Sequence, residues 1–188
     1  VKKHLIEMIY EYTQRGFHVI ELHSDSEFEC LESTIKPIVL IRYRKDSHVG
    51  EVERSIETMK TVTRSLVHSM PYKKLPNLMI EELVAQAEDI LNIFHSRRGI
   101  SKDMSPGAIV MGTPKADYKN SHLDIGAYCQ IPTKSNNTQS ARRMAGIALR
   151  RTRTGHSFMS LATGERVERQ SWTEMTSIPY IVVSAVHA

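Results

Sequence analysis

Apolar residues recur every three or four positions between Gly50 and about Ser69, which is the periodicity of an amphipathic α-helix. This mostly apolar line consists of Val52, Ile56, Met59, Thr63, Leu66 and Met70. A second line with the same step consists of the charged residues Glu53, Glu57, Lys60 and Arg64. At about 100° per residue the charged line lies roughly a quarter-turn from the apolar one. We therefore expect the apolar line to be buried and the charges to edge a packed surface, although Glu57 and Lys60 also suit a simple surface pair.

Upstream of this helix the pattern predicts one further helix and two strands. Residues 2–15 predict a helix that Gly16 terminates, because glycine suits the left-handed position after a helix end. Residues 17–23 and 37–43 predict two strands, and the second is apolar nearly throughout, which is typical of a strand covered on both faces. The order helix, strand, strand, helix predicts an α/β layer.

Downstream, the residues predict a short helix and then a run of strands. Ser105 followed by Pro106 predicts the start of this helix. The strand-like runs are residues 126–131, 145–150, 155–161 and 166–172. We expect an α/β domain over residues 1–114 and a small antiparallel β-barrel domain over residues 115–188, with a meander as the alternative arrangement of its strands.

The composition is that of a soluble globular chain, with 40% hydrophobic and 24% charged residues among 188. No apolar run approaches the roughly 18 residues of a membrane span, and no signal-peptide pattern is present, so no membrane partner is expected. Cys30 and Cys129 lie far apart and the nine histidines are scattered, so we expect neither a disulfide framework nor a structural zinc site. The chain starts at Val1 rather than at a methionine, which suggests a piece of a longer protein.

The net charge of +4 is unevenly distributed along the chain. Residues 119–188 contain nine Lys/Arg and four Asp/Glu, a surplus of +5, whereas residues 1–118 contain 16 and 17, a balance of −1. A concentrated basic surface is the usual electrostatic footprint of nucleic-acid binding, although it also serves solubility. The arginines expected on this surface are Arg142, Arg143, Arg150, Arg151, Arg153, Arg166 and Arg169. Few aromatic residues besides Trp172 lie nearby, which favours phosphate contact over base stacking.

Two carboxylates follow the predicted strand and helix boundaries. Asp25 comes after the first strand, and Glu53 lies in the first turn of the helix that begins at Gly50. In an α/β layer both would reach the same edge, where they could share Mg²⁺ or Mn²⁺ and position phosphates for in-line attack. An alternative stays open for Asp25, because Ser24 and Glu27 fit a capping box in which Asp25 only stabilises a short helix.

At this point the residues resemble a known family. The stretches His23-Ser-Asp-Ser-Glu-Phe-Glu and His48-Val-Gly-Glu-Val-Glu-Arg-Ser-Ile are similar to the second and third acidic motifs of copia-type retrotransposon integrases, which have an RNase H-like fold. Residues 78–92 resemble the long helix that closes that family's catalytic core, and residues 99–112 the segment after it. The resemblance covers nearly the whole chain and implies a fragment of a Gag-Pol polyprotein.

The resemblance implies a partial RNase H-like integrase core followed by an SH3-like β-barrel that contacts DNA. Asp25 and Glu53 match two of the family's three catalytic, metal-binding acids, with Mg²⁺ or Mn²⁺ as cofactor. Glu51 is not the match, because two residues along a helix correspond to about 200° of rotation. Lys60, seven residues after Glu53 and on the same face, and Arg64 are candidate contacts to DNA phosphates, like the arginines from Arg142 to Arg153. Double-stranded DNA of the element ends and target, a nuclear location, and a homo-oligomer when complete are also implied.

Three departures from the family pattern shape the expected function. The family's first aspartate lies upstream of residues 2–15 and its N-terminal zinc module precedes that, so neither is in this chain. The 28 positions between Asp25 and Glu53 are also fewer than the family usually shows. We expect part of an integrase, a metal-dependent phosphoryl transferase acting on DNA 3′ ends, that is inactive as this fragment. The alternative is a non-catalytic nucleic-acid-binding remnant of a degenerate transposable element.

Overall fold

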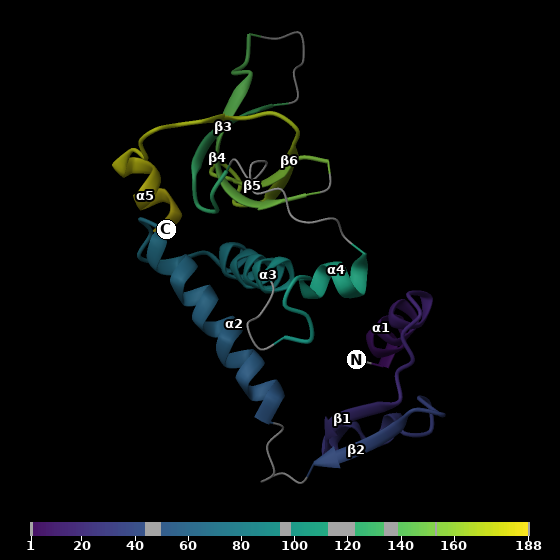
Figure 1. Cartoon of the computed structure of the whole chain (residues 1–188). Coiled ribbons are helices and arrows are strands. Elements are labelled where there is room, and N and C mark those ends of the chain that lie inside the picture. The colour runs from purple at the N-terminus through teal and green to yellow at the C-terminus, as the bar shows by residue number, and fades with distance from the viewer. Residues whose placement is uncertain are drawn as a thin grey trace. The chain divides into compact units, whose positions relative to one another are not determined.

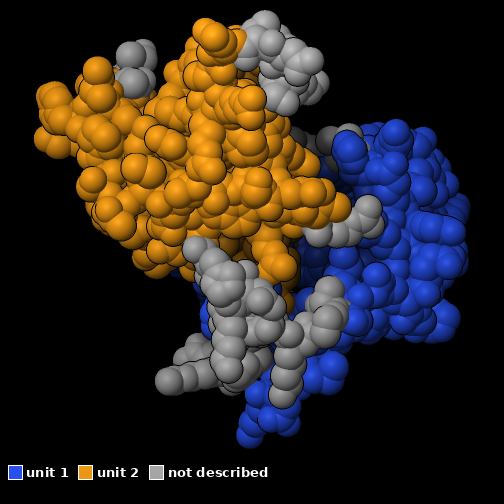
Figure 2. Space-filling model, turned by 90° about the horizontal axis from the view of Figure 1, so that it is seen from above, with its two compact units in different colours: residues 1–58, 93–115 blue, residues 59–92, 116–188 orange. Residues whose placement is uncertain are grey.

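The computed structural model shows a mixed α/β protein (Figure 1). It describes residues 2–43, 50–94, 99–112, 123–133, 139–152 and 154–187. The chain divides into two compact units, which Figure 2 colours separately. Unit 1 contains residues 1–58 and 93–115, and unit 2 contains residues 59–92 and 116–188. The predicted division between residues 114 and 115 falls outside the described residues and stays a prediction.

Unit 1 combines helices with a two-stranded parallel sheet. Its elements are α1 (Lys2–Gln14), β1 (Glu21–Asp25), the 3₁₀-helix η1 (Ser26–Leu31), β2 (Val39–Tyr43) and α4 (Pro106–Met111). Gly16 follows α1 with a φ of 81°, the left-handed conformation predicted for it. Ser105 caps α4 as predicted, because its hydroxyl oxygen accepts a hydrogen bond from the N–H of Ala108.

The strands of unit 1 are less buried than the sequence pattern predicted. β1 begins at Glu21 rather than at Phe17, and Val39 at the start of β2 is 56% exposed. The prediction that residues 37–43 are covered on both faces is therefore wrong. Parallel strands are covered when layers pack on both faces, and Leu31 and Ile35 are the only buried apolar residues in the described part of unit 1.

The helix α2 (Gly50–Ser69) has the bounds that its periodicity predicted. Its residues from Met59 onward belong to unit 2, and there the predicted apolar line is half-buried. In the first turns Val52 and Ile56 are 50% and 47% exposed, so the expectation that the whole line is buried is wrong. Periodicity selects a helix face, but burial also requires a surface that packs against it.

Unit 2 is built on a five-stranded antiparallel sheet with helices beside it. Its elements are α3 (Asn77–Ile93), β3 (Tyr128–Pro132), β4 (Arg143–Arg151), β5 (His156–Ser160), β6 (Arg166–Arg169), β7 (Thr173–Glu174) and α5 (Tyr180–His187). The last residue of α3, Ile93, is assigned to unit 1. The strand order is β6-β5-β4-β3-β7. The antiparallel sheet was predicted, but the barrel is wrong, because β6 and β7 are the two open edges among the described strands. The alternative is confirmed for β3 to β6, which pair in sequence order as a meander.

Although it is open, the sheet is curled (Figure 1). β5 and β4 separate β6 from β3, which would place those two strands about 14 Å apart in a flat sheet. Nevertheless, Nε of Arg169 on β6 donates a hydrogen bond of 2.7 Å to the carbonyl of Pro132 on β3. A side chain therefore joins two strands that share no ladder.

Both faces of this sheet carry an apolar cluster. One contains residues of α3, α5, the sheet and the connection before α3, namely Tyr72, Met79, Ile147, Leu149, Met159, Val182 and Val186. The other contains Leu123, Cys129, Ile131, Ala148 and Phe158, with Trp172 packed against it. Strand alternation explains this division, because neighbouring residues such as Phe158 and Met159 lie on opposite faces. Packing on both faces leaves every residue of β5 buried.

The helix α5 was not predicted, because residues 181–183 are β-branched and favour a strand by intrinsic propensity. The structure instead buries Val182 and Val186, four residues apart, in the cluster that contains Met79. In a helix these two residues are about one turn apart, so both lie on the side that faces the cluster. Packing against the sheet therefore overrides the local preference.

A β-bulge interrupts the ladder between β4 and β5 from Ala148 to Arg151. The hydroxyl of Ser157 donates to the carbonyl of Arg150 at 2.9 Å and accepts from the N–H of Arg150 at 3.2 Å. Ser157 is 2% exposed, so its hydroxyl supplies partners that water would otherwise provide. The bulge also lets two consecutive residues, Leu149 and Arg150, both contact α3 or the cluster beside it.

Ser157→Ala should lower the free energy of unfolding of unit 2 by about 2 kcal/mol, because it leaves the part-buried N–H and C=O of Arg150 without the Ser157 hydroxyl as partner. Urea unfolding followed by the fluorescence of Trp172, the single tryptophan of the chain, measures this loss. Ser171→Ala, at an exposed position in the same unit, is the matched control. Equal losses from the two changes would contradict the role of Ser157 at the bulge.

We expect the stability of unit 2 to depend on pH because of His156. Its ring lies 5.2 Å from that of Phe158 and 5.5 Å from that of Trp172. Burial lowers the pKa of His156 below 6.5, and this effect exceeds the raising effect of the hydrogen bond to the Ser157 carbonyl. The charge of Arg151 lowers the pKa by a lesser amount. The unfolded chain therefore binds more protons, so stability is complete above about pH 6.5 and declines as pH falls through the lowered pKa. Melting temperatures from about pH 7.5 to about pH 5 should show a shallower decline for His156→Gln than for the unchanged chain.

Candidate nucleic-acid interface and metal ligands

The two predicted metal ligands come from β1 and α2. Asp25 is the last residue of β1 and pairs in the ladder with Tyr43, but its side chain lies outside the described part of the structure. Glu53 lies exposed in the first turn of α2. The shared metal site therefore stays a prediction. The alternative for Asp25 required Ser24 to cap a short helix, and this capping box is not formed, because the buried hydroxyl of Ser24 has no hydrogen-bond partner although η1 begins at Ser26.

A polar array that we did not predict lies on the same strands. Nδ1 of His23 lies 2.8 Å from the hydroxyl oxygen of Tyr43, and its Nε2 lies 3.3 Å from a carboxylate oxygen of Glu21. The rings of His23 and Tyr43 are stacked, with centroids 5.6 Å apart. Glu21, His23 and Asp25 are every second residue of β1, and this alternation of polar residues was the available signal. Among the described side chains, no three His, Cys, Asp or Glu residues gather as potential metal ligands.

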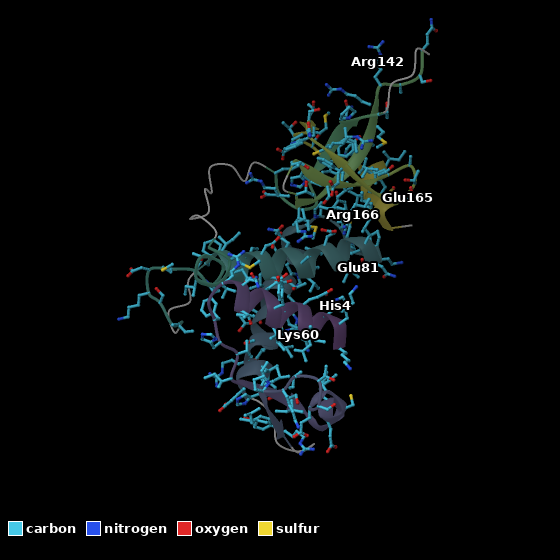
Figure 3. The ribbon with its side chains drawn as sticks, turned by 90° about the vertical axis from the view of Figure 1, so that its right-hand side faces the viewer. His4, Lys60, Glu81, Arg142, Glu165 and Arg166 are labelled. Atoms are coloured by element: carbon cyan, nitrogen blue, oxygen red, sulfur yellow. The ribbon has the colours of Figure 1, made fainter. Side chains whose placement is uncertain are left out.

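The basic residues predicted on α2 are accessible. Lys60 and Arg64 are both exposed, and a spacing of four residues places them on one side of the helix. Lys60 is labelled in Figure 3. It follows Glu53 by seven residues, two helical turns, so the cation and the carboxylate share one side of α2.

The predicted arginines of the sheet differ in their exposure and partners. Arg142 and Arg151 are exposed, and Arg143 is exposed while its Nη1 donates to the hydroxyl of Thr173 at 2.5 Å. Arg153 lies outside the described residues. Figure 3 shows Arg142 at the end of the sheet away from Arg166 and Glu165.

Two further arginines bind a carboxylate that the sequence did not single out. Glu82 of α3 is 2% exposed and forms ion pairs with Arg166 and, at 3.2 Å between Oε2 and Nε, with Arg150. The contact to Arg150 is an ion pair without hydrogen-bond alignment. Nη1 of Arg150 also lies 3.4 Å from Oδ2 of Asp89. We call Glu82, Asp89, Arg150 and Arg166 the α3 latch, because they join α3 to β4 and β6.

The spacing of residues along α3 contains a signal for the α3 latch. Met79, Leu83 and Ala87 form the buried apolar side of α3. Glu82 lies three residues from Met79, so it belongs to the same side of the helix, where a carboxylate requires a cationic partner. Asp89 follows Glu82 by seven residues and therefore also lies on that side.

Two other ionisable groups of unit 2 are structural. The hydroxyl of Tyr72 donates to the carbonyl of Gly126 at 2.8 Å, and burial, then the nearby Cys129, raises the pKa of Tyr72 to about 12. Burial, followed by the charge of Glu174, likewise raises the pKa of Cys129 to about 12. Both groups are protonated at neutral pH, and a protonated thiol is neither a nucleophile nor a metal ligand.

In the described part of the chain, no helix combines the length and the apolar character needed to cross a lipid bilayer. No model of a known protein family matches the chain, and no curated protein matches it. Function must therefore be inferred from the placement of the acids and basic residues and from the resemblance of the acidic motifs.

Proposed function

We propose that the chain is part of a copia-type retrotransposon integrase and binds double-stranded DNA through basic side chains of α2 and the antiparallel sheet. One observation carries this proposal: five of the seven residues predicted to contact phosphates are exposed. They are Lys60, Arg64, Arg142, Arg143 and Arg151. Exposed cations can replace the counterions of DNA phosphates without breaking contacts inside the protein.

Under this proposal, unit 1 belongs to an RNase H-like core and the curled sheet of unit 2 is an SH3-like domain. The parallel pairing of β1 and β2, with Asp25 at the carboxyl end of β1, supports the first assignment. The curled antiparallel sheet of short strands supports the second. The nuclear location and the homo-oligomer of the complete protein are parts of the same proposal.

Asp25 and Glu53 would hold Mg²⁺ or Mn²⁺, because both offer the hard carboxylate oxygens that these ions prefer. Glu53 is exposed in the first turn of α2. The chemistry that such an ion supplies is activation of the attacking oxygen and neutralisation of the leaving oxygen in phosphoryl transfer to or from a DNA 3′ end. The protein's own contribution is positioning, in which Lys60 would hold a phosphate on the side of α2 that carries Glu53.

A second candidate function is DNA binding without catalysis, in a remnant of a degenerate element. The difference in packing between the units favours it. The described residues of unit 2 form two apolar clusters, whereas those of unit 1 bury only Leu31 and Ile35 as apolar side chains. A binding remnant needs a stable unit 2 and makes no demand on unit 1.

The full chain should bind a fluorescently labelled duplex of about 30 base pairs with little sequence preference. If three to five of the exposed cations contact phosphates, log affinity should fall linearly with log salt with a slope of roughly −3 to −5. Fluorescence anisotropy between about 50 and about 200 mM salt measures this slope. Unlabelled duplexes of unrelated sequence should compete equally. An affinity that does not change with salt would contradict DNA binding by these residues.

A further inference from the structure

Basic residues occupy both ends of β4. Arg142 and Arg143 stand at its beginning and Arg150 and Arg151 at its end. A strand of nine residues separates its first and last residues by at most about 26 Å. The two ends therefore form separate surfaces, and their contacts show which of them is available to a ligand.

At the later end, the charge of Arg150 is already neutralised. The α3 latch pairs Arg150 with Glu82 and Asp89, and it pairs Arg166 with Glu82. Either arginine could bind a DNA phosphate only by giving up its ion pair with Glu82, and Glu82 is 2% exposed. An unpaired charge at such a position is strongly unfavourable, so the latch arginines are poor candidates for DNA contacts.

At the other end, three arginines gather around Pro132. Arg143 pairs with Pro132 in the ladder between β3 and β4. The carbonyl of Arg142 accepts the N–H of Thr133 at 2.9 Å, and Nε of Arg169 donates to the carbonyl of Pro132 at 2.7 Å. We call Arg142, Arg143 and Arg169 the Pro132 corner.

The side-chain partners of the Pro132 corner are electrically neutral. Arg143 donates to the hydroxyl of Thr173, and Arg169 donates to the carbonyls of Pro132 and Glu168. Within the described part of the chain, no carboxylate forms an ion pair with these three arginines, in contrast to the latch. Three positive charges therefore remain unneutralised at one corner of the sheet.

We propose that the Pro132 corner is a surface of unit 2 that contacts the phosphates of duplex DNA, and that the latch arginines only hold α3. The proposal rests on the proposed DNA binding and refines it, because it excludes Arg150 and includes Arg169. Arg142 and Arg143 are the residues that reach the phosphates, since both are exposed. Arg169 is half-buried and adds positive charge behind them.

The test compares variants of the full chain in salt titrations with labelled duplex DNA. Arg142→Gln with Arg143→Gln should reduce the steepness of the salt slope by about 2 and weaken binding about tenfold or more near physiological salt. Arg142→Lys with Arg143→Lys keeps both charges and should keep the slope. Neither pair should change the melting temperature, because neither arginine pairs with a carboxylate in the described residues.

Arg150→Gln serves as the contrasting variant. It should lower the melting temperature while leaving the salt slope unchanged, measured at low temperature where circular dichroism shows the chain folded. A salt slope that is unchanged by the two glutamines, or one that is reduced by Arg150→Gln in the folded chain, would overturn the assignment of the Pro132 corner. Absence of salt-dependent binding by the unchanged chain would instead overturn the proposed function itself, and the first titration detects it before any variant is compared.

Discussion

Glu82→Gln is expected to lower the free energy of unfolding of unit 2 by about 3 kcal/mol. The change keeps the shape of the side chain but removes the charge on which Arg150 and Arg166 converge. The amide of glutamine also places its own N–H donors beside the N–H donors of the two arginines, which need an acceptor. We place the loss at the lower end of the range for broken buried ion pairs, because the side chains of Arg150 and Arg166 are 36% and 46% exposed and can turn toward water.

Glu81→Gln is the matched control. Glu81 is the preceding residue of the same helix, it undergoes the same chemical change, and it is exposed (Figure 3). Its effect should stay below about 0.5 kcal/mol. Urea unfolding followed by Trp172 fluorescence compares the two variants. Similar losses would mean that α3 packs on the sheet in a different rotation about its axis.

The reciprocal changes separate charge pairing from packing. Arg150→Met together with Arg166→Met should destabilise unit 2 strongly, because the buried carboxylate of Glu82 loses both partners in the latch. Adding Glu82→Leu should recover most of that stability, because replacing every member of a buried ion pair by apolar residues often leaves the free energy of unfolding nearly unchanged. A triple variant as unstable as the double one would show that the latch arginines act through packing of their side-chain stems.

In a longer protein that joins this chain to an upstream strand with an aspartate, Glu53→Gln should abolish metal-dependent processing of DNA ends. Glutamine keeps the size and helix propensity of the side chain but removes the charge that would bind the metal. Glu51→Gln should change the rate little, because about 200° of helix rotation separates Glu51 from Glu53. The assay follows shortening and joining of a labelled duplex in Mg²⁺ or Mn²⁺.

The present chain should bind the ion weakly and leave the duplex intact, because two acids without a third under-coordinate the cation. Glu53→Gln in the longer protein should still bind DNA, since the proposed phosphate contacts lie on other residues. Equal loss from Glu51→Gln and Glu53→Gln would place the wrong residue of α2 at the site. Full activity after Glu53→Gln would assign the chemistry elsewhere, and an inactive longer protein that binds DNA would favour the non-catalytic remnant.

Local sequence determined α1, α2 and the start of α4 well. The spacing of apolar residues predicted the bounds of α2, because a helix satisfies its own backbone hydrogen bonds and needs only one consistent face. The helix α3 was expected from the family resemblance, within one residue of its bounds. Gly16 and the pair Ser105–Pro106 marked helix ends through conformations that are set within a few residues. The alternating polar residues of β1 and the arginine surplus after residue 119 were also visible in the sequence.

Tertiary structure alone decided the burial and the ion pairing of residues that look equivalent in sequence. Glu81 and Glu82 are adjacent and identical, yet only Glu82 is buried, because the sheet covers one side of α3. Arg150 and Arg151 are likewise adjacent and identical, and the bulge at β4 directs Arg150 to the α3 latch while Arg151 remains exposed. α5 forms against its β-branched preference because Val182 and Val186 complete the apolar cluster. Long-range packing sets which side of each element is covered, and therefore which charges are paired inside the protein and which remain available to DNA.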